Sequence, residues 1–364
     1  MRNDPTRQVA CPRRARGSWD AHGSLGSRGA GHARGLLGRA LHFALVLVVA
    51  FAAAAALAQA PLDTLRIWHP NTMAFAAPFK LIGESGVLAD YARSVEINEW
   101  TTPDILRSVL VNGGSEVTAV PTYVGANLAN RGVDVKMAAV IVWGLLWVIG
   151  PDGAAPEWES LRGQTVLIPF ANDMPDLVFQ RLAVANGLTP GKDFTIQYFA
   201  TPQDVVAQLV GGRGQWAVMP EHLATVALAN ANRNGQALGR FLNLQDEWAI
   251  ITGRSRIPQA GIVVPSRLAA ERPDVLGGVL TALEQAVAKV NAADAETVAT
   301  LAAAFDLPAP VLSDVIPRLN LAVVPAAEAR EELEAFYSEL AVLSPDIIGG
   351  GLPDASFYLP DPRE

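Results

Sequence analysis

Two histidines downstream of residue 60, His69 and His222, are the first candidates for catalysis or metal binding in this chain. Neither has a second histidine or a local carboxylate at metal-ligand spacing, although Glu221 directly precedes His222. The sequence has no P-loop, no HExxH, no GxSxG and no GxGxxG that follows a strand pattern. We therefore expect no catalytic residue, no metal site and no cofactor, and a protein that is not an enzyme.

Polar residues instead gather at four predicted strand-to-helix turns, at 69–73, 121–123, 169–176 and 220–222. In parallel α/β sheets, ligands bind beyond the carboxyl ends of the strands, where helix N-termini offer free N–H groups. These turns therefore predict the walls of a small-molecule site. The candidate ligand-binding residues are His69, Asn71, Thr72, Met73, Thr122, Tyr123, Trp143, Phe170, Asn172, Asp173, Met174, Glu221 and His222.

A purely structural role is open for many of these residues. The polar residues Thr72 and Thr122 could serve only as helix caps. Asp173 lies at a helix start, where a carboxylate favourably meets the helix dipole. Trp143 falls inside an apolar strand pattern, and the methionines near the turns are typical of core packing.

The pattern along the chain alternates strands and helices, which predicts parallel sheets. One unit ends in a long apolar stretch at 133–149, which we interpret as a single buried strand. A second unit begins after Pro151. The chain then returns to the first unit through a short strand at 260–264. We expect two crossings between lobes, near 150–158 and 247–260, and hence a hinge beside a ligand cleft.

The N-terminal region has the features of a secretory signal peptide. Eight Arg residues precede an apolar run from Ala40 to Leu57, which ends in small residues, and we expect cleavage after Ala58. An uncleaved membrane anchor is the alternative, because the run is at the short limit for a span. The predicted division is 1–58 signal peptide, 59–150 plus 260–364 lobe one, and 151–259 lobe two.

The composition after residue 58 narrows the possible partners. The eight Arg and two acids ahead of it leave 20 Lys and Arg against 34 Asp and Glu, a net charge of −14. Such an acidic protein is a poor candidate for nucleic acid or anionic membrane surfaces. The only cysteine is Cys11, so disulfide and thiolate chemistry are not expected in the exported part. We expect a soluble, monomeric, periplasmic protein.

Several motifs resemble known sequences, in a consistent order. They are Leu161-Arg162-Gly163-Gln164-Thr165-Val166, then Thr201-Pro202-Gln203-Asp204, Leu209-Val210-Gly211-Gly212 and Ala217-Val218-Met219-Pro220-Glu221, and finally Ile316-Pro317-Arg318-Leu319 and Ile348-Gly349-Gly350-Gly351-Leu352-Pro353-Asp354. This series resembles nitrate/taurine-type substrate-binding proteins of ABC importers, in an uncharacterised branch. The resemblance implies a two-lobe type II periplasmic-binding-protein fold, capture of a small molecule between the lobes, and ABC permease and ATPase subunits as partners.

Two departures from the family pattern concern the ligand. His222 stands where the family has a proline, and the turn at 170–176 carries Asp173 and Asp176 where anion-binding members often have Ser or Thr. Carboxylates at the mouth oppose an anion, so we expect a neutral or cationic ligand. Two other functions remain open: an enzyme on the same fold, like those of pyrimidine or menaquinone synthesis, and a ligand-sensing module for a membrane receptor.

We predict that the mature protein begins near Gln59 and is free in the periplasm, because a basic region, an apolar run and small residues occur in that order. N-terminal sequencing of the protein from the envelope fraction measures this directly. A full-length chain in the cytosol would contradict the prediction.

Overall fold

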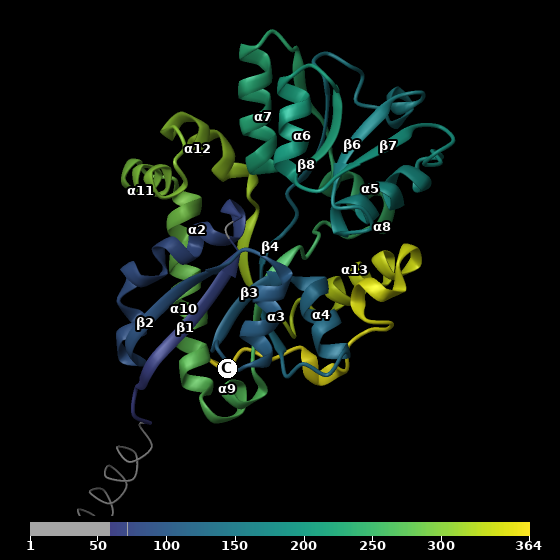
Figure 1. Ribbon diagram of the computed structural model, residues 1–364. Coiled ribbons are helices and arrows are strands. Elements are labelled where there is room, and N and C mark those ends of the chain that lie inside the picture. The colour runs from purple at the N-terminus through teal and green to yellow at the C-terminus, as the bar shows by residue number, and fades with distance from the viewer. Residues whose placement is uncertain (1–58, 71) are drawn as a thin grey trace, which may run out of the picture. The chain divides into compact units, whose positions relative to one another are not determined.

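The computed structural model describes residues 59–70 and 72–364 (Figure 1). The expected signal peptide and the candidate residue Asn71 lie outside the described residues. Within the described part, no single helix is long and apolar enough to cross a membrane, while one bent pair, Ala295–Phe305 with Ala309–Arg318, meets the criterion of length and composition.

A six-stranded sheet forms the centre of what we call lobe one. Its strand order is β11-β4-β10-β3-β1-β2. The strands are β1 (Leu62–Pro70), β2 (Ala92–Trp100), β3 (Val117–Pro121), β4 (Lys136–Val142), β10 (Ala260–Val264) and β11 (Leu321–Pro325). β1 is parallel to β2 and β3, whereas β10 runs antiparallel between β3 and β4. The chain thus returns to the middle of its first sheet, as expected for 260–264.

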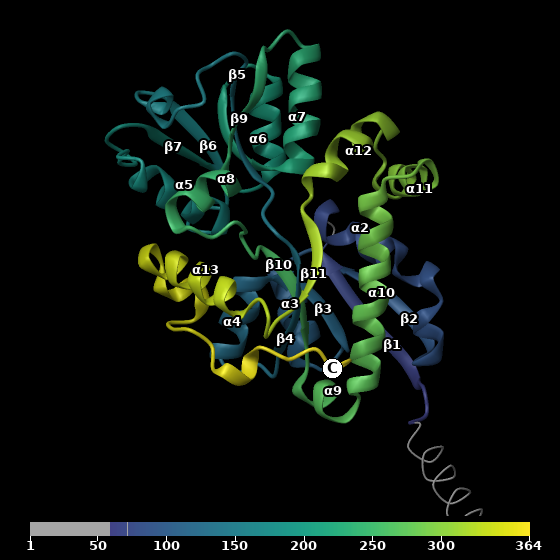
Figure 2. The ribbon, with the colours of Figure 1, turned by 180° about the vertical axis from the view of Figure 1, so that it is seen from behind.

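Helices cover both faces of this sheet (Figures 1 and 2). The helices of this lobe are α2 (Met73–Leu81), α3 (Pro103–Val111), α4 (Thr122–Asn130), α9 (Ser266–Glu271), α10 (Pro273–Ala292), α11 (Ala295–Phe305), α12 (Ala309–Val315) and α13 (Arg330–Leu343). The alternating residues Leu65 and Ile67 of β1 are fully buried and share a core with Phe79 of α2 and Leu280 of α10. The opposite face, with Val120 and Val140, packs on α4.

A five-stranded sheet forms the centre of lobe two, with the order β7-β6-β8-β5-β9. Its strands are β5 (Leu146–Pro151), β6 (Thr165–Pro169), β7 (Thr195–Phe199), β8 (Trp216–Pro220) and β9 (Leu238–Asn243). Its helices are α5 (Met174–Ala185), α6 (Pro202–Val210), α7 (Glu221–Arg233) and α8 (Leu244–Thr252). β6 is parallel to β7 and β8, so the turns that follow β6 and β8 lie at the same edge of the sheet.

The predicted single strand over 133–149 is wrong, and so is the crossing expected at 150–158. β4 and β5 belong to different sheets, and the chain passes between them at residues 143–145. Gly144 makes the break with a φ of 80°, a conformation that suits glycine. The second crossing spans 253–259, inside the range expected from the sequence.

A single hydrophobic core extends through both lobes on the side of α13. Phe336 of α13 packs edge-on against Trp248 of α8, with ring centroids 5.8 Å apart. The ion pair between Arg181 of α5 and Glu339 of α13 (2.5 Å) joins the same elements. Because α13 follows β11 of lobe one, while α5 and α8 belong to lobe two, this region ties the two sheets together.

We predict that Gly261→Ala lowers the free energy of unfolding by about 2 kcal/mol, because overpacking a filled core costs roughly that much. A Cβ at Gly261 would collide with the carbonyl oxygen of Ala139 and lie 2.9 Å from Met137 Sδ. The matched control is Gly83→Ala, whose Cβ would meet nothing within 4 Å. Urea unfolding of both variants measures the difference. Equal stabilities would show that β10 is not packed this tightly.

Candidate ligand-binding site

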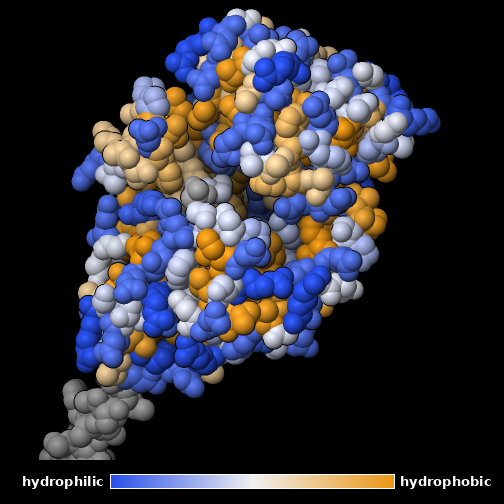
Figure 3. All heavy atoms as spheres, viewed as in Figure 1, coloured by the Kyte–Doolittle hydropathy of each residue, from blue (hydrophilic) through white to orange (hydrophobic). Residues whose placement is uncertain are grey.

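The surface is hollowed between the two lobes (Figure 3). The turns that follow β3 and β6 contact each other across the lobes, because the Tyr123 hydroxyl donates a hydrogen bond to Asp173 Oδ1 (2.5 Å). Burial, followed by the neighbouring Asp173 carboxylate, raises the pKa of Tyr123 well above its ordinary value. Tyr123 is therefore neutral and donates this hydrogen bond. The contact brings together two of the predicted turns, 121–123 and 169–176.

The turn from Phe170 to Asp173 has an unusual backbone. Phe170 and Asn172 both adopt left-handed conformations, with φ of 61° and 60°. Asp176 holds the turn in place: its buried carboxylate accepts hydrogen bonds from the Asn172 N–H (2.8 Å), the Gln180 amide (2.7 Å) and the Tyr198 hydroxyl (3.2 Å). A left-handed phenylalanine is costly, and such conformations cluster at functional sites. The Phe170 side chain is 41% exposed.

Asp173 fulfils the structural role that the sequence left open for it. It is the N-cap of α5, and its Oδ1 accepts from the Met174 N–H (2.8 Å) as well as from Tyr123. The side chain remains half-buried. Asp173 thus caps one helix and links the lobes at the same time.

Thr122 is occupied by structural contacts. Its side chain is fully buried, and its hydroxyl donates to the Pro258 carbonyl (2.5 Å). Its backbone N–H donates to the Gln259 carbonyl (3.1 Å), and its own carbonyl accepts from the Tyr337 hydroxyl (3.0 Å). Thr122 therefore anchors the second crossing and has no group left for a ligand.

His69 faces the core of lobe one. It continues the buried face of β1 and stacks on Phe79, with centroids 5.4 Å apart. Its Nδ1 lies 2.8 Å from the Pro70 carbonyl, which can only accept, so the proton is on Nδ1. Desolvation by burial lowers the pKa of His69, which keeps the ring neutral. The structure thus places His69 beneath α2, apart from the Tyr123–Asp173 contact.

Three further candidates are also packed in cores. Met73 and Met174 are each 5% exposed and belong to the hydrophobic cores of lobe one and of the lobe-spanning region. Trp143 lies at the first crossing, where its Nε1–H donates to the Ala322 carbonyl (2.9 Å) and Arg256 covers its ring at 3.9 Å. Thr72 differs: it is the N-cap of α2, yet its half-buried hydroxyl makes no capping hydrogen bond.

Glu221 is the centre of an ion network. Its fully buried carboxylate accepts from Arg240 Nε (3.0 Å) and Nη2 (2.5 Å), from the Thr225 hydroxyl (2.6 Å) and from Arg318 Nε (2.9 Å). Asp314 lies 2.7 Å from Arg318 Nη2 and 3.7 Å from Arg240 Nη2. Two carboxylates thus face two guanidinium groups, and the charges of the network balance.

Sequence reasoning missed Arg240, Arg318 and Asp314 because none is near Glu221 in the chain. Arg318 did lie in one of the quoted motifs, Ile316 to Leu319, and that was the one available signal. The network weakens the support for a neutral or cationic ligand, because only Asp173 of the three acids keeps a half-buried carboxylate. Glu221 and Asp176 are satisfied within the protein, so they no longer argue against an anion.

His222 follows Glu221 at the start of α7 and is 8% exposed. Its Nδ1 is buried and has no hydrogen-bond partner among the described residues. Desolvation by burial lowers the pKa of His222 to about 4, so the ring is neutral at physiological pH. A neutral imidazole can offer either a donor or an acceptor to a bound molecule.

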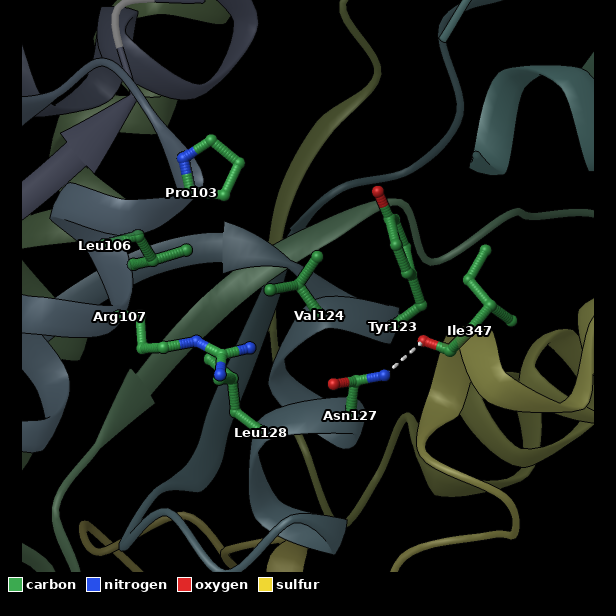
Figure 4. Close-up of a pocket in the computed structure, with 8 residues that line it drawn as sticks. All are labelled: Pro103, Leu106, Arg107, Tyr123, Val124, Asn127, Leu128 and Ile347. Carbon is green, nitrogen blue, oxygen red and sulfur yellow. Dashed lines mark hydrogen bonds between the residues drawn. The ribbon is translucent and has the colours of Figure 1, made fainter. Parts of the chain in front are cut away.

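A separate pocket of ≈ 240 Å³ lies on lobe one beside Tyr123 (Figure 4). Its walls come from α3, α4 and Ile347, and the Tyr123 ring stands at its edge. The other predicted site residues do not line it. The pocket therefore adjoins the candidate site but does not contain it.

No protein-family model and no curated protein sequence matches this chain. Solved structures do. An ABC transporter protein from Parabacteroides distasonis superposes with a TM-score of 0.67 at 19% identity, over 82% of this chain and 99% of that one. The periplasmic aliphatic sulphonate-binding protein from Escherichia coli gives 0.62 at 16% identity, over 79% and 90%. The periplasmic nitrate-binding protein from Synechocystis PCC 6803 gives 0.57 at 16%, over 80% and 85%.

At these identities the likeness establishes the fold. The chain has the two-lobe α/β fold of periplasmic binding proteins, which confirms the expected fold class. Two of these neighbours are a sulphonate-binding and a nitrate-binding protein, so the resemblance inferred from short motifs extends to the fold.

We predict that the free energy of unfolding falls as the pH is lowered from about 6.5 to about 4, because of proton binding at His222. Its pKa is lower in the folded protein than in the unfolded chain, so the unfolded chain binds the proton first, and stability rises with pH across this window. The full effect is about 3 kcal/mol. Urea unfolding at several pH values, compared with His222→Phe, isolates this contribution from that of the carboxylates. Parallel stability curves for the two proteins would contradict it.

Proposed function

We propose, from this shared fold, that the chain is a solute-binding protein that captures a small molecule between its lobes for an ABC importer. The observation that carries the proposal is the meeting of the turn after β3 with the turn after β6, through Tyr123 and Asp173. Ligands of α/β sheets bind beyond the carboxyl ends of the strands, and these two turns follow such ends in different sheets.

The proposed site residues are turn residues that keep exposed area or a polar group for a ligand, including Tyr123, whose ring packs in a core but whose hydroxyl joins the two turns. They are Thr72, Tyr123, Phe170, Asn172, Asp173 and His222. The half-exposed Phe170 ring offers an apolar wall, while Tyr123, Asp173 and His222 offer polar atoms of either hydrogen-bonding character. Asn71 is retained from the sequence-based set. The proposed lobes meet at residues 143–145 and 253–259.

The proposed setting is the periplasm, after removal of residues 1–58. The permease and ATPase subunits of an importer are the proposed partners. Capture would require no cofactor: a ligand that contacts both lobes stabilises their closed arrangement against opening. A permease that recognises the ligand-bound protein would then receive the solute.

Native mass spectrometry of the protein purified from its own envelope identifies a bound molecule without prior choice of compound. Thermal-shift titration with anions, neutral compounds and amines then measures saturable binding. The proposal expects one stoichiometric ligand that leaves unchanged. Conversion of the ligand to a product would favour an enzyme, and binding of no small molecule in either assay would contradict capture.

We predict that Phe170→Gly weakens ligand binding about tenfold, since burying the exposed part of the ring contributes roughly 1.4 kcal/mol. Glycine also relieves the left-handed backbone at this position, so stability should not fall greatly. The matched control is Asp306→Gly, which relieves a φ of 52° at an exposed position outside the site. Calorimetric titration of both variants should show a loss of affinity for Phe170→Gly alone. If Phe170→Gly and the control bind the ligand with equal affinity, the turn that carries Phe170 does not contact the ligand.

A further inference from the structure

The ion network around Glu221 joins elements of different lobes. Glu221, Thr225 and Arg240 belong to α7 and β9 of lobe two. Arg318 and Asp314 belong to the short segment between α11 and β11, which is continuous with the first sheet. The Arg318 Nε–Glu221 Oε1 contact of 2.9 Å therefore spans the two lobes.

This contact differs from an ordinary surface ion pair. Glu221 has no exposed side-chain area, and Arg318 is only 30% exposed. An exposed ion pair contributes little to stability because water can solvate both charges. A buried carboxylate has no water to solvate it, so it depends on its partners in the protein. Removal of Arg318 would still leave Glu221 paired with Arg240 and Thr225, so lobe two keeps its own internal charge balance.

A second region joins the lobes at a different place. There, Tyr123 donates to Asp173, and Arg181 pairs with Glu339 of α13. In Figure 1, α7 and α12 lie on one side of the molecule, and α5 and α13 on the other. Side-chain contacts thus join the two lobes in two places, at the Glu221 network and at the contacts of Asp173 and Arg181.

We propose that Arg318 is a positioning residue that holds the start of α7 against lobe one and keeps the cleft closed before any ligand arrives. This inference goes beyond the proposed function, because it concerns the ligand-free protein. The start of α7 carries His222, so Arg318 also fixes where that imidazole stands. A ligand would enter a cleft that is already shaped, and binding would not require a large movement of the lobes.

The test is the distance between the lobes in the ligand-free protein. Cys11 is the only cysteine, so with Cys11→Ser two spin labels can be placed uniquely at Asp104→Cys on α3 and Gln203→Cys on α6, both exposed. The proposal expects one narrow distance population. Arg318→Met should add a second, longer population and increase the radius of gyration in solution scattering.

Matched variants distinguish a specific effect of Arg318 on the lobe positions from a general loss of stability. Arg233→Met removes an exposed arginine of α7 whose contacts stay within that helix, and it should leave the narrow population unchanged. Glu221→Gln, which keeps the hydrogen bond from Thr225, should broaden the distances as Arg318→Met does, and it serves as the test if Arg318→Met does not fold. A broad distribution in the unmodified protein, or an unchanged one in Arg318→Met and Glu221→Gln, would overturn the proposal even if ligand capture is established.

Discussion

Two short chain crossings, at 143–145 and 253–259, determine where both walls of the cleft stand. The first helical N–H of α4, from Thr122, donates to the Gln259 carbonyl (3.1 Å) in the second crossing. The first N–H of α7, from Glu221, donates to the Leu145 carbonyl (2.7 Å) in the first. Helix N-termini have no intrahelical partners for these groups, so the crossings satisfy them. Gln259 also joins the crossings to each other, because its side-chain oxygen accepts from the Leu145 N–H (3.1 Å).

Among the described residues, the fully buried carboxylates Asp176 and Glu221 each have several hydrogen-bond donors as partners. Asp176 accepts three hydrogen bonds, and Glu221 faces two arginines and a threonine. A buried charge without partners would cost several kcal/mol. These acids therefore hold the backbone of the turns, whereas Phe170, Asn172 and the half-buried Asp173 are the contacts that we propose for a ligand.

The sequence predicted most of what depends on local pattern. Turn residues marked the ends of β3, β6 and β8. The break at Gly144 was hidden because β4 and β5 are both apolar, so their junction looks like one buried strand. Arg318 could not be assigned to Glu221 because 97 residues separate them. His69 was placed in the site because of its position at a strand end, although its alternation with Leu65 and Ile67 indicated the buried face.

We propose that one small molecule is held between the lobes by the turns after β3 and β6. A crystal structure of the protein isolated from its native envelope with its bound molecule would locate that molecule. We expect ordered density that contacts Tyr123 from lobe one and the Phe170–Asp173 turn from lobe two. Density confined to a single lobe, such as in the pocket between α3 and α4, would contradict it.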